Sequence, residues 1–126
     1  MVAGLWLKRA EVIFIVSNIF KRIPEVNKSM NVKYLDKGGV VSFNDFIINK
    51  TISLEAQLDN LKEDMLQIEF SDGYLLDVGW RPSFSKNGEF KIVLIKDFNW
   101  DEPVYSGSAK NIIELETEIE IAIDNI

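Results

Sequence analysis

The hydrophobic period of this chain changes near residue 65, and that change most constrains what the chain can fold into. Over residues 5–23 the apolar residues recur at helical spacings, whereas around Ile68 and Phe70 they alternate with polar neighbours. Alternation places every second side chain on the same face of a strand. Residues 65–105 therefore predict a series of half-buried β-strands.

Turn residues divide this stretch into four strands. Ser71-Asp72-Gly73 predicts a tight hairpin turn, and residues 82–88 and 99–103 predict longer connections. The predicted strands of this antiparallel meander lie around Ile68 and Phe70, and at Tyr74–Trp80, Glu89–Ile95 and Val104–Gly107. We expect the most apolar strand, Glu89–Ile95, at the centre of the sheet, and Val104–Gly107 at its edge.

The N-terminal part carries helical periodicity instead. Apolar residues at spacings of three, four and seven predict an amphipathic, core-facing helix over residues 5–23, which Pro24 ends. Its apolar run, Val12–Phe20, is nine residues long, well below the roughly 20 that span a bilayer, and Glu11 opens it. We therefore expect neither a membrane span nor a secretion signal, and the expected location is cytoplasmic.

Two shorter helices are expected between residues 42 and 61. Ser42-Phe-Asn-Asp45 matches a capping box and predicts a short helix over residues 43–50. Val40–Phe43 would also suit a short strand, and the sequence leaves this alternative open. Ser53 is expected to cap a further helix that runs to about Leu61.

The tail from residue 112 to residue 126 fits two patterns. Three glutamates alternate with other residues as in a strand, but the apolar positions also form one helical seam. The seam consists of Ile112, Leu115, Ile119, Ala122 and Ile126. About 15 residues is long for a strand and typical for a helix, so we predict a helix with Ser108 as its cap. The predicted fold is a single α+β domain over residues 1–126, with N-terminal helices, a four-stranded antiparallel β-meander and a C-terminal helix packed on the sheet.

The chain contains no cysteine and no histidine, which excludes several kinds of chemistry. Thiol nucleophiles, zinc–thiolate sites and an ordinary Ser-His-Asp triad are impossible. Pairs of carboxylates exist, but they are expected at turns and strand ends, where Asp is common for backbone reasons. The acidic run from Asp97 to Glu102 lacks the spacing of a calcium loop, and the glycines form no phosphate-binding pattern. We expect no enzymatic activity, no catalytic residue, no metal and no other cofactor.

The formal net charge of −6 is unevenly distributed along the chain. Residues 1–62 hold nine Lys and Arg against six Asp and Glu, whereas residues 63–126 hold five against fourteen. An acidic half repels phosphate backbones and attracts basic proteins, whose association it accelerates. The charge distribution thus favours a basic protein partner over nucleic acid.

Several aromatic and turn positions of the second half recur in a known class of proteins. They are Tyr74-Leu-Leu-Asp77-Val-Gly79-Trp80-x-Pro82, Gly88-x-Phe90, Lys96-Asp97-x-x-Trp100-x-x-Pro103, and a helix that starts near Asn111-Ile-Ile-Glu-Leu. Over residues 65–126 the chain resembles small acidic bacterial immunity proteins of contact-dependent growth inhibition and related polymorphic toxin systems. The resemblance implies a non-enzymatic inhibitor that binds a cognate toxin domain in the cytoplasm. Many such toxins are nucleases with basic clefts, which an acidic surface would complement.

Charge and position, rather than a shared motif, select the residues that we expect to bind this partner. The predicted contacts are Asp72, Asp77, Glu89, Asp97, Trp100, Asp101 and Glu102, with Trp100 as the anchor. Trp80 and Trp100 both stand at predicted strand ends, where each either completes the core or joins an interface. A second candidate face consists of Glu114, Glu116, Glu118 and Glu120.

A different function in the binding class is also compatible with the sequence. The chain would then be a non-enzymatic adaptor or regulatory domain, or a self-associating domain that uses the helix containing Trp6, Phe14 and Phe20. Both functions are consistent with the same acidic, aromatic meander. The sequence leaves the oligomeric state open.

Overall fold

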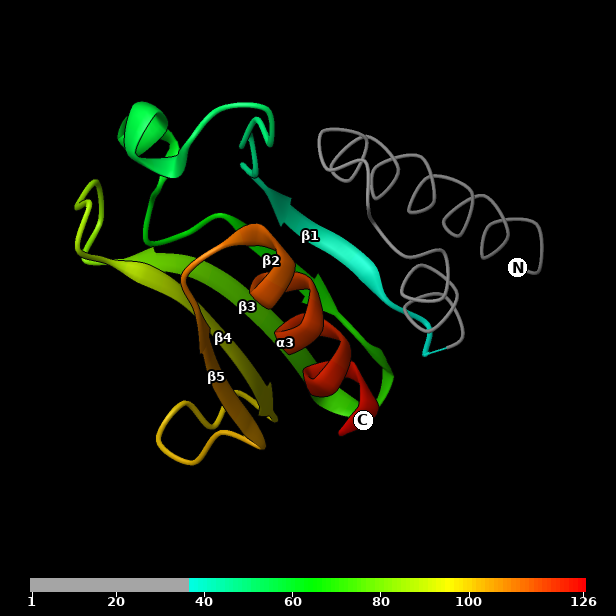
Figure 1. Ribbon diagram of the computed structural model, residues 1–126. Coiled ribbons are helices and arrows are strands. Elements are labelled where there is room, and N and C mark those ends of the chain that lie inside the picture. Colours follow the sequence, from blue (N-terminus) through cyan, green and yellow to red (C-terminus); the bar gives the residue numbers. More distant parts are fainter. Residues whose placement is uncertain (1–36) are drawn as a thin grey trace.

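The computed structural model describes residues 37–126 as one antiparallel sheet with a helix across one face (Figure 1). The strand order β1-β2-β3-β4-β5 follows the chain, so strands adjacent in the sequence are paired. The elements are β1 (Val40–Asn44), the 3-10 helix η1 (Leu54–Asn60), β2 (Leu66–Glu69), the short 3-10 turn η2 (Ser71–Gly73), β3 (Tyr74–Arg81), β4 (Glu89–Lys96), β5 (Tyr105–Ala109) and α3 (Ile112–Asp124). The helix expected over residues 5–23 lies outside the described residues.

The predicted α+β class, the antiparallel sheet and the C-terminal helix packed on it are confirmed. The hairpin turn at Ser71–Gly73 and the position of β5 at the edge of the sheet are confirmed as well. The described sheet has five strands instead of four, because β1 pairs with β2. This extra strand makes β3 the middle strand of the five, and the segment Glu89–Ile95 lies beside it in the interior of the sheet, paired on both sides.

The helix expected over residues 43–50 is also wrong, because both polar residues of the apparent capping box bind elsewhere. The Ser42 hydroxyl donates to the Gln67 carbonyl across the sheet at 3.4 Å. The Asp45 carboxylate accepts a hydrogen bond from Lys62 Nζ at 2.7 Å. With neither side chain turned back to the local backbone, the β-branched residues of Val40–Asn44 favour the strand.

The ends of the helical segments follow local hydrogen bonding. Ser53 caps η1 as expected, since its hydroxyl oxygen accepts the Ala56 N–H at 3.2 Å. Helix α3 confirms the helical alternative for the tail, but Asn111 is its cap and accepts the Glu114 N–H at 2.9 Å. The predicted cap, Ser108, lies in β5 and accepts a hydrogen bond from Lys91 instead.

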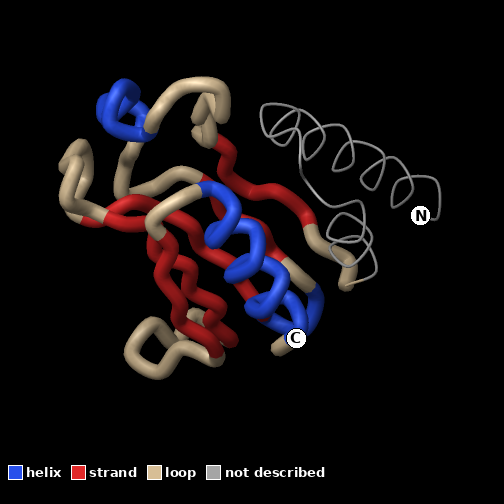
Figure 2. The backbone as a smooth tube through the Cα atoms, in the orientation of Figure 1, coloured by secondary structure: helices blue, strands red, loops and turns tan. Residues whose placement is uncertain are grey.

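One face of the sheet and the inner side of α3 enclose the core. Figure 2 shows α3 lying across the strands, with η1 away from it at one end of the sheet. The buried side chains of this face include Leu76, Val78, Trp80, Phe90, Ile92 and Leu94 from the strands, and Leu115, Ile119, Ala122 and Ile123 from α3. The Trp80 indole packs edge-on against Phe90 at 4.9 Å and donates its N–H to the Ser85 carbonyl at 2.8 Å. Trp80 therefore completes the core, which was one of its two predicted roles.

Gly79 allows an irregular segment to cross β3 on the opposite face. A Cβ at this position would lie 1.7 Å from the Glu63 carbonyl oxygen. Backbone hydrogen bonds on both sides hold the segment there, from Met65 N–H to Val78 at 3.0 Å and from Trp80 N–H to Lys62 at 2.7 Å. Because the obstacle is backbone, it cannot move aside as a flexible side chain would.

We expect Gly79→Ala to lower the free energy of unfolding by about 3 kcal/mol, at the upper end of the usual cost of overpacking. Urea denaturation at equilibrium measures this change. Ser106→Ala, on the exposed side of β5, is the control and should change stability by less than about 0.5 kcal/mol. Equal stability of Gly79→Ala and the wild type would contradict the close approach of residues 62–65 to β3.

Candidate functional site

Two loops and the end of α3 meet at one end of the sheet (Figure 1). The register pairs Tyr74, at the start of β3, with Lys96, at the end of β4. The Asp97 N–H then donates to the Gly73 carbonyl at 2.9 Å and joins the β4–β5 loop to the β2–β3 turn. We call residues 71–74 and 96–103 together the strand-end surface.

The β4–β5 loop begins with a turn whose two central residues both have positive φ. The Asn99 N–H donates to the Lys96 carbonyl at 3.1 Å, and φ is 52° at Asp97 and 58° at Phe98. This is the φ pattern of a type I′ turn, which favours Asn and Gly because a Cβ crowds the left-handed backbone. Holding a Phe in this conformation costs about 1–2 kcal/mol.

The aromatic side chains of this loop project into solvent. Phe98 is 77% exposed and Trp100 is 49% exposed. Burial of Phe98 in the core therefore does not offset the strain of its backbone. Strained residues of this kind concentrate at functional sites, where their conformation serves recognition rather than stability. The combination of strain and exposure makes this loop the best candidate for a binding site.

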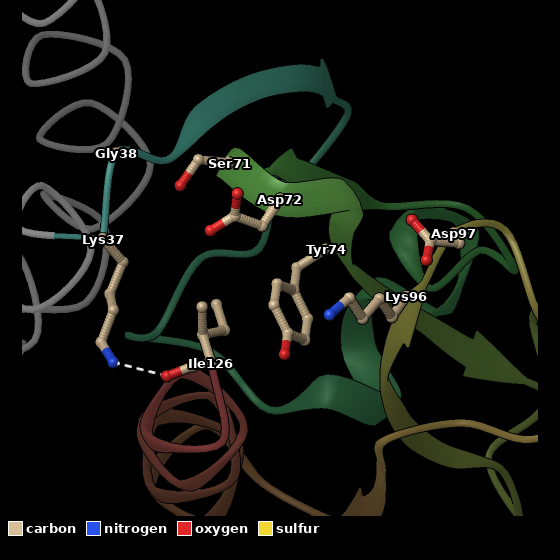
Figure 3. Close-up of a pocket in the computed structure, with 8 residues that line it drawn as sticks. All are labelled: Lys37, Gly38, Ser71, Asp72, Tyr74, Lys96, Asp97 and Ile126. Carbon is tan, nitrogen blue, oxygen red and sulfur yellow. Dashed lines mark hydrogen bonds between the residues drawn. The ribbon is translucent and has the colours of Figure 1, made fainter.

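A shallow pocket of about 860 Å³ lies beside the β2–β3 turn (Figure 3). It is lined by Lys37, Gly38, Ser71, Asp72, Tyr74, Lys96, Asp97 and Ile126. Lys37 Nζ donates to the Ile126 carbonyl at 2.8 Å, and Lys96 Nζ lies 5.0 Å from the centre of the Tyr74 ring. Lys37 and Lys96 thus each contact another residue of the pocket, whereas the Asp72 and Asp97 carboxylates are exposed at its border.

Five of the seven predicted contact residues belong to the strand-end surface. They are Asp72, Asp97, Trp100, Asp101 and Glu102, all of them exposed. Within residues 37–126, none of these four carboxylates forms an ion pair with a basic side chain. Their charges thus remain available to a cationic partner.

The other two predicted contacts are placed and bonded differently. Asp77 lies in the middle of β3, is only 7% exposed and accepts a hydrogen bond from Gln67 at 2.9 Å. Burial raises the pKa of its carboxyl above the ordinary value, and the hydrogen bond from Gln67 opposes this effect. Glu89 lies at the far end of β4 and pairs with Lys91 at 2.8 Å, a hydrogen bond that lowers the pKa of Glu89. The structure therefore brings neither residue to the strand-end surface.

The glutamates of the second candidate face are largely engaged in the fold. Glu114 accepts a hydrogen bond from the Asn111 side chain at 2.6 Å, and Glu118 accepts one from the Tyr105 hydroxyl. Glu116 is half-buried, and burial raises the pKa of its carboxyl while the nearby Lys50 charge opposes the shift. Glu120 is half-buried as well. These contacts make α3 a weaker candidate interface than the strand-end surface.

Sequence reasoning missed Phe98, the most exposed of the large hydrophobic side chains in residues 37–126. The sequence carries no turn signal at this point, because neither Asn nor Gly marks the turn centred on Asp97-Phe98. The contact of Lys96 with Tyr74 was also missed, since it depends on the pairing register of β3 with β4.

Comparison of the chain with protein-family models, with curated protein sequences and with solved structures gives no match. Among the helices of residues 37–126, none is both long enough and apolar enough to cross a membrane. In the same residues, no three acidic side chains converge in a way that could hold a metal ion. The proposals below therefore depend on the geometry and charge of this chain and on the resemblance given above.

The buried charge of Asp77 leads to a prediction about pH. Burial raises the folded-state pKa above 3.8, so the folded protein holds this proton more tightly than the unfolded chain, and Asp77 lowers stability as the pH rises through the folded pKa. Asp77→Asn keeps the side-chain size and an acceptor for Gln67. We expect it to stabilise the protein at about pH 7, with a gain that fades below about pH 3.8.

Urea denaturation of Asp77→Asn and of the wild type, at about pH 7 and at a pH below about 3.8, measures the difference in unfolding free energy. Asp59→Asn, an exposed acid in η1, is the matched control and should change stability by less than about 0.5 kcal/mol at either pH. A loss of stability in Asp77→Asn at neutral pH would show that the Asp77 charge is favourable, contrary to its burial.

Proposed function

We propose that this chain is a non-enzymatic inhibitor that binds a cognate toxin domain through the strand-end surface. The observation that carries the proposal is the grouping of exposed side chains on one surface. Three carboxylates and two aromatic side chains lie in the strained β4–β5 loop, Asp72 lies in the adjoining β2–β3 turn, and none of the four carboxylates forms an ion pair within residues 37–126. The resemblance of residues 65–126 to bacterial immunity proteins supplies the class of partner. Such an inhibitor acts in the cytoplasm, where it meets the incoming toxin.

The chemistry of the strand-end surface suits a basic partner such as a nuclease. A nuclease cleft is lined with Lys and Arg because its substrate is a polyanion. Asp97, Asp101 and Glu102 present carboxylates to such a cleft, and opposite charges accelerate the encounter. Phe98 and Trp100 then supply apolar contact area that charge alone does not provide. Occupation of the cleft by this surface would exclude the nucleic acid.

An adaptor or regulatory domain is the second candidate, and one observation favours it. A second exposed aromatic residue, Phe84, has a φ of 62° and lies in the β3–β4 loop, at the opposite end of the sheet. Two separate recognition loops would allow the protein to hold two partners at once. The activity of the bound partner distinguishes the two functions, because an adaptor leaves its partner active, whereas an inhibitor does not.

The charge of the loop can be tested with Asp101→Lys/Glu102→Lys. We expect this variant to bind the cognate toxin domain, to be sought in the neighbouring upstream reading frame, at least tenfold more slowly at low salt, since electrostatic steering raises association rates by about 10–10³-fold. Surface plasmon resonance at low and high salt measures the rate, and a growth assay with the co-expressed toxin measures protection.

The matched control is Glu55→Lys/Asp59→Lys, which makes the same change of net charge in η1, at the other end of the sheet. This control should bind and protect like the wild type. If both double variants protect equally well, the acidic part of the strand-end surface is not the contact.

The strain at Phe98 separates binding from stability. Phe98→Gly removes the crowded Cβ at positive φ, so we expect unfolding free energy to stay equal or to rise by up to about 1 kcal/mol. Loss of an exposed aromatic anchor should weaken partner binding by about tenfold or more. Urea denaturation and titration calorimetry measure the two effects.

Phe84→Gly makes the same change at a residue of similar φ at the opposite end of the sheet, and it should leave the affinity for the toxin unchanged. A Phe98→Gly variant that binds with wild-type affinity would exclude Phe98 from the interface.

A further inference from the structure

A second pocket, of about 350 Å³, lies at the opposite end of the sheet from the strand-end surface. We call it the Trp80 pocket; it is lined by Leu54, Glu55, Leu58, Trp80, Lys86, Asn87, Gly88 and Lys110. It is small for a ligand site, since such pockets measure about 300–1,000 Å³, and this size suits one aromatic side chain better than a large metabolite.

Local contacts give the Trp80 pocket a fixed wall. The Trp80 indole N–H and the Gly88 N–H both donate to Ser85, the first at 2.8 Å and the second at 3.0 Å. A Cβ at Gly88 would lie 2.4 Å from Trp80 Nε1, so the loop passes directly against the indole. The wall is thus formed before any ligand arrives, which lowers the entropic cost of binding.

The Trp80 pocket has a small apolar patch and a polar, basic rim. Leu54 and Leu58, both half-buried, provide the apolar patch, whereas Trp80 is only 3% exposed, and Lys86 and Lys110 stand exposed at the border. Within the described part of the chain, neither lysine forms an ion pair, and Glu55 is the single acidic residue of the lining. Such a pocket fits an aromatic group that carries carboxylates beside it.

The strand-end surface carries such a group. Phe98 projects from the β4–β5 loop next to Asp97, and Asp101 and Glu102 follow three and four residues later. A single copy cannot insert this loop into its own Trp80 pocket, because the eight residues of β3 separate the two ends of the sheet by about 24 Å. A second copy can supply it.

We propose that the strand-end surface of one copy docks into the Trp80 pocket of another, with Phe98 in the pocket and the loop carboxylates on Lys86 and Lys110. The contact joins two different surfaces, so each added copy leaves one pocket and one loop free. The result is reversible head-to-tail association that grows with concentration. Because it covers the strand-end surface, self-association competes with binding of any partner at that surface.

Sedimentation velocity of the full chain at rising concentration, in about 50 mM and about 500 mM NaCl, tests this proposal. We expect the sedimentation coefficient to increase with concentration at low salt and much less at high salt. Lys86→Glu/Lys110→Glu and Asp101→Lys/Glu102→Lys should each stay monomeric, because each places like charges across the contact.

The decisive sample is the equimolar mixture of these two variants. It should associate again, since every contact between unlike variants joins opposite charges, and this recovery also shows that both variants are folded. A wild-type chain that stays monomeric at all concentrations would overturn the proposal. Association that persists in either variant alone would do the same, because it would place the contact elsewhere in the chain.

The Trp80 pocket does not contribute to the proposed toxin interface, so the two proposals fail separately. Lys86→Glu/Lys110→Glu should lose self-association and bind the toxin domain at least as tightly as the wild type does. Phe98→Ser should weaken self-association at least tenfold, as expected for an aromatic anchor in a pocket. Wild-type self-association of Phe98→Ser would exclude Phe98 from the pocket.

Discussion

The eight-residue pairing of β3 with β4 is the constraint on which the rest of the structure depends. Its register places six buried apolar side chains on the face that α3 covers, namely Leu76, Val78, Trp80, Phe90, Ile92 and Leu94. Leu75, Asp77, Gly79 and Ile95 lie on the other face. Its length sets the distance between the two loops that flank it. The Trp80 pocket forms at one end of the ladder and the strand-end surface at the other, so a single register determines the core and both candidate binding regions.

The parts of the fold that depend on period and local turn chemistry were predictable. The alternation around Ile68 and Phe70 and the turn at Ser71–Gly73 are signals carried by neighbouring residues. The strand Val40–Asn44 was not predictable in this way, because Ser42 and Asp45 match a capping box locally. Only their hydrogen bonds to Gln67 and Lys62, which are distant in the sequence, favour a strand over a helix. Local patterns fail where a partner far along the chain offers a better hydrogen bond.

The predicted site residues differ in the same way, because the environment of some depends on neighbours in the sequence and that of others on distant residues. Charge and position selected seven residues, but whether each carboxylate is free depends on its neighbours in space. Lys91 lies two residues from Glu89 on the same face of a strand, so that pair follows from period alone. Gln67 lies opposite Asp77 only through the register of β2 with β3, which the sequence does not specify uniquely. Compensation by neighbours, rather than acidity itself, separates the carboxylates of the strand-end surface from those of Asp77 and Glu89.

Backbone strain supports the same assignment from an independent direction. Phe98 and Phe84 both adopt positive φ with large exposed side chains, one in each loop of the β3–β4–β5 unit. A loop under selection for stability alone would carry Gly or Asn at such positions, because either residue relieves the crowding. Neither side chain is buried in return, and the proposed recognition role would account for keeping Phe at both positions. Two strained aromatic loops at opposite ends of one rigid ladder are what recognition at both ends would require.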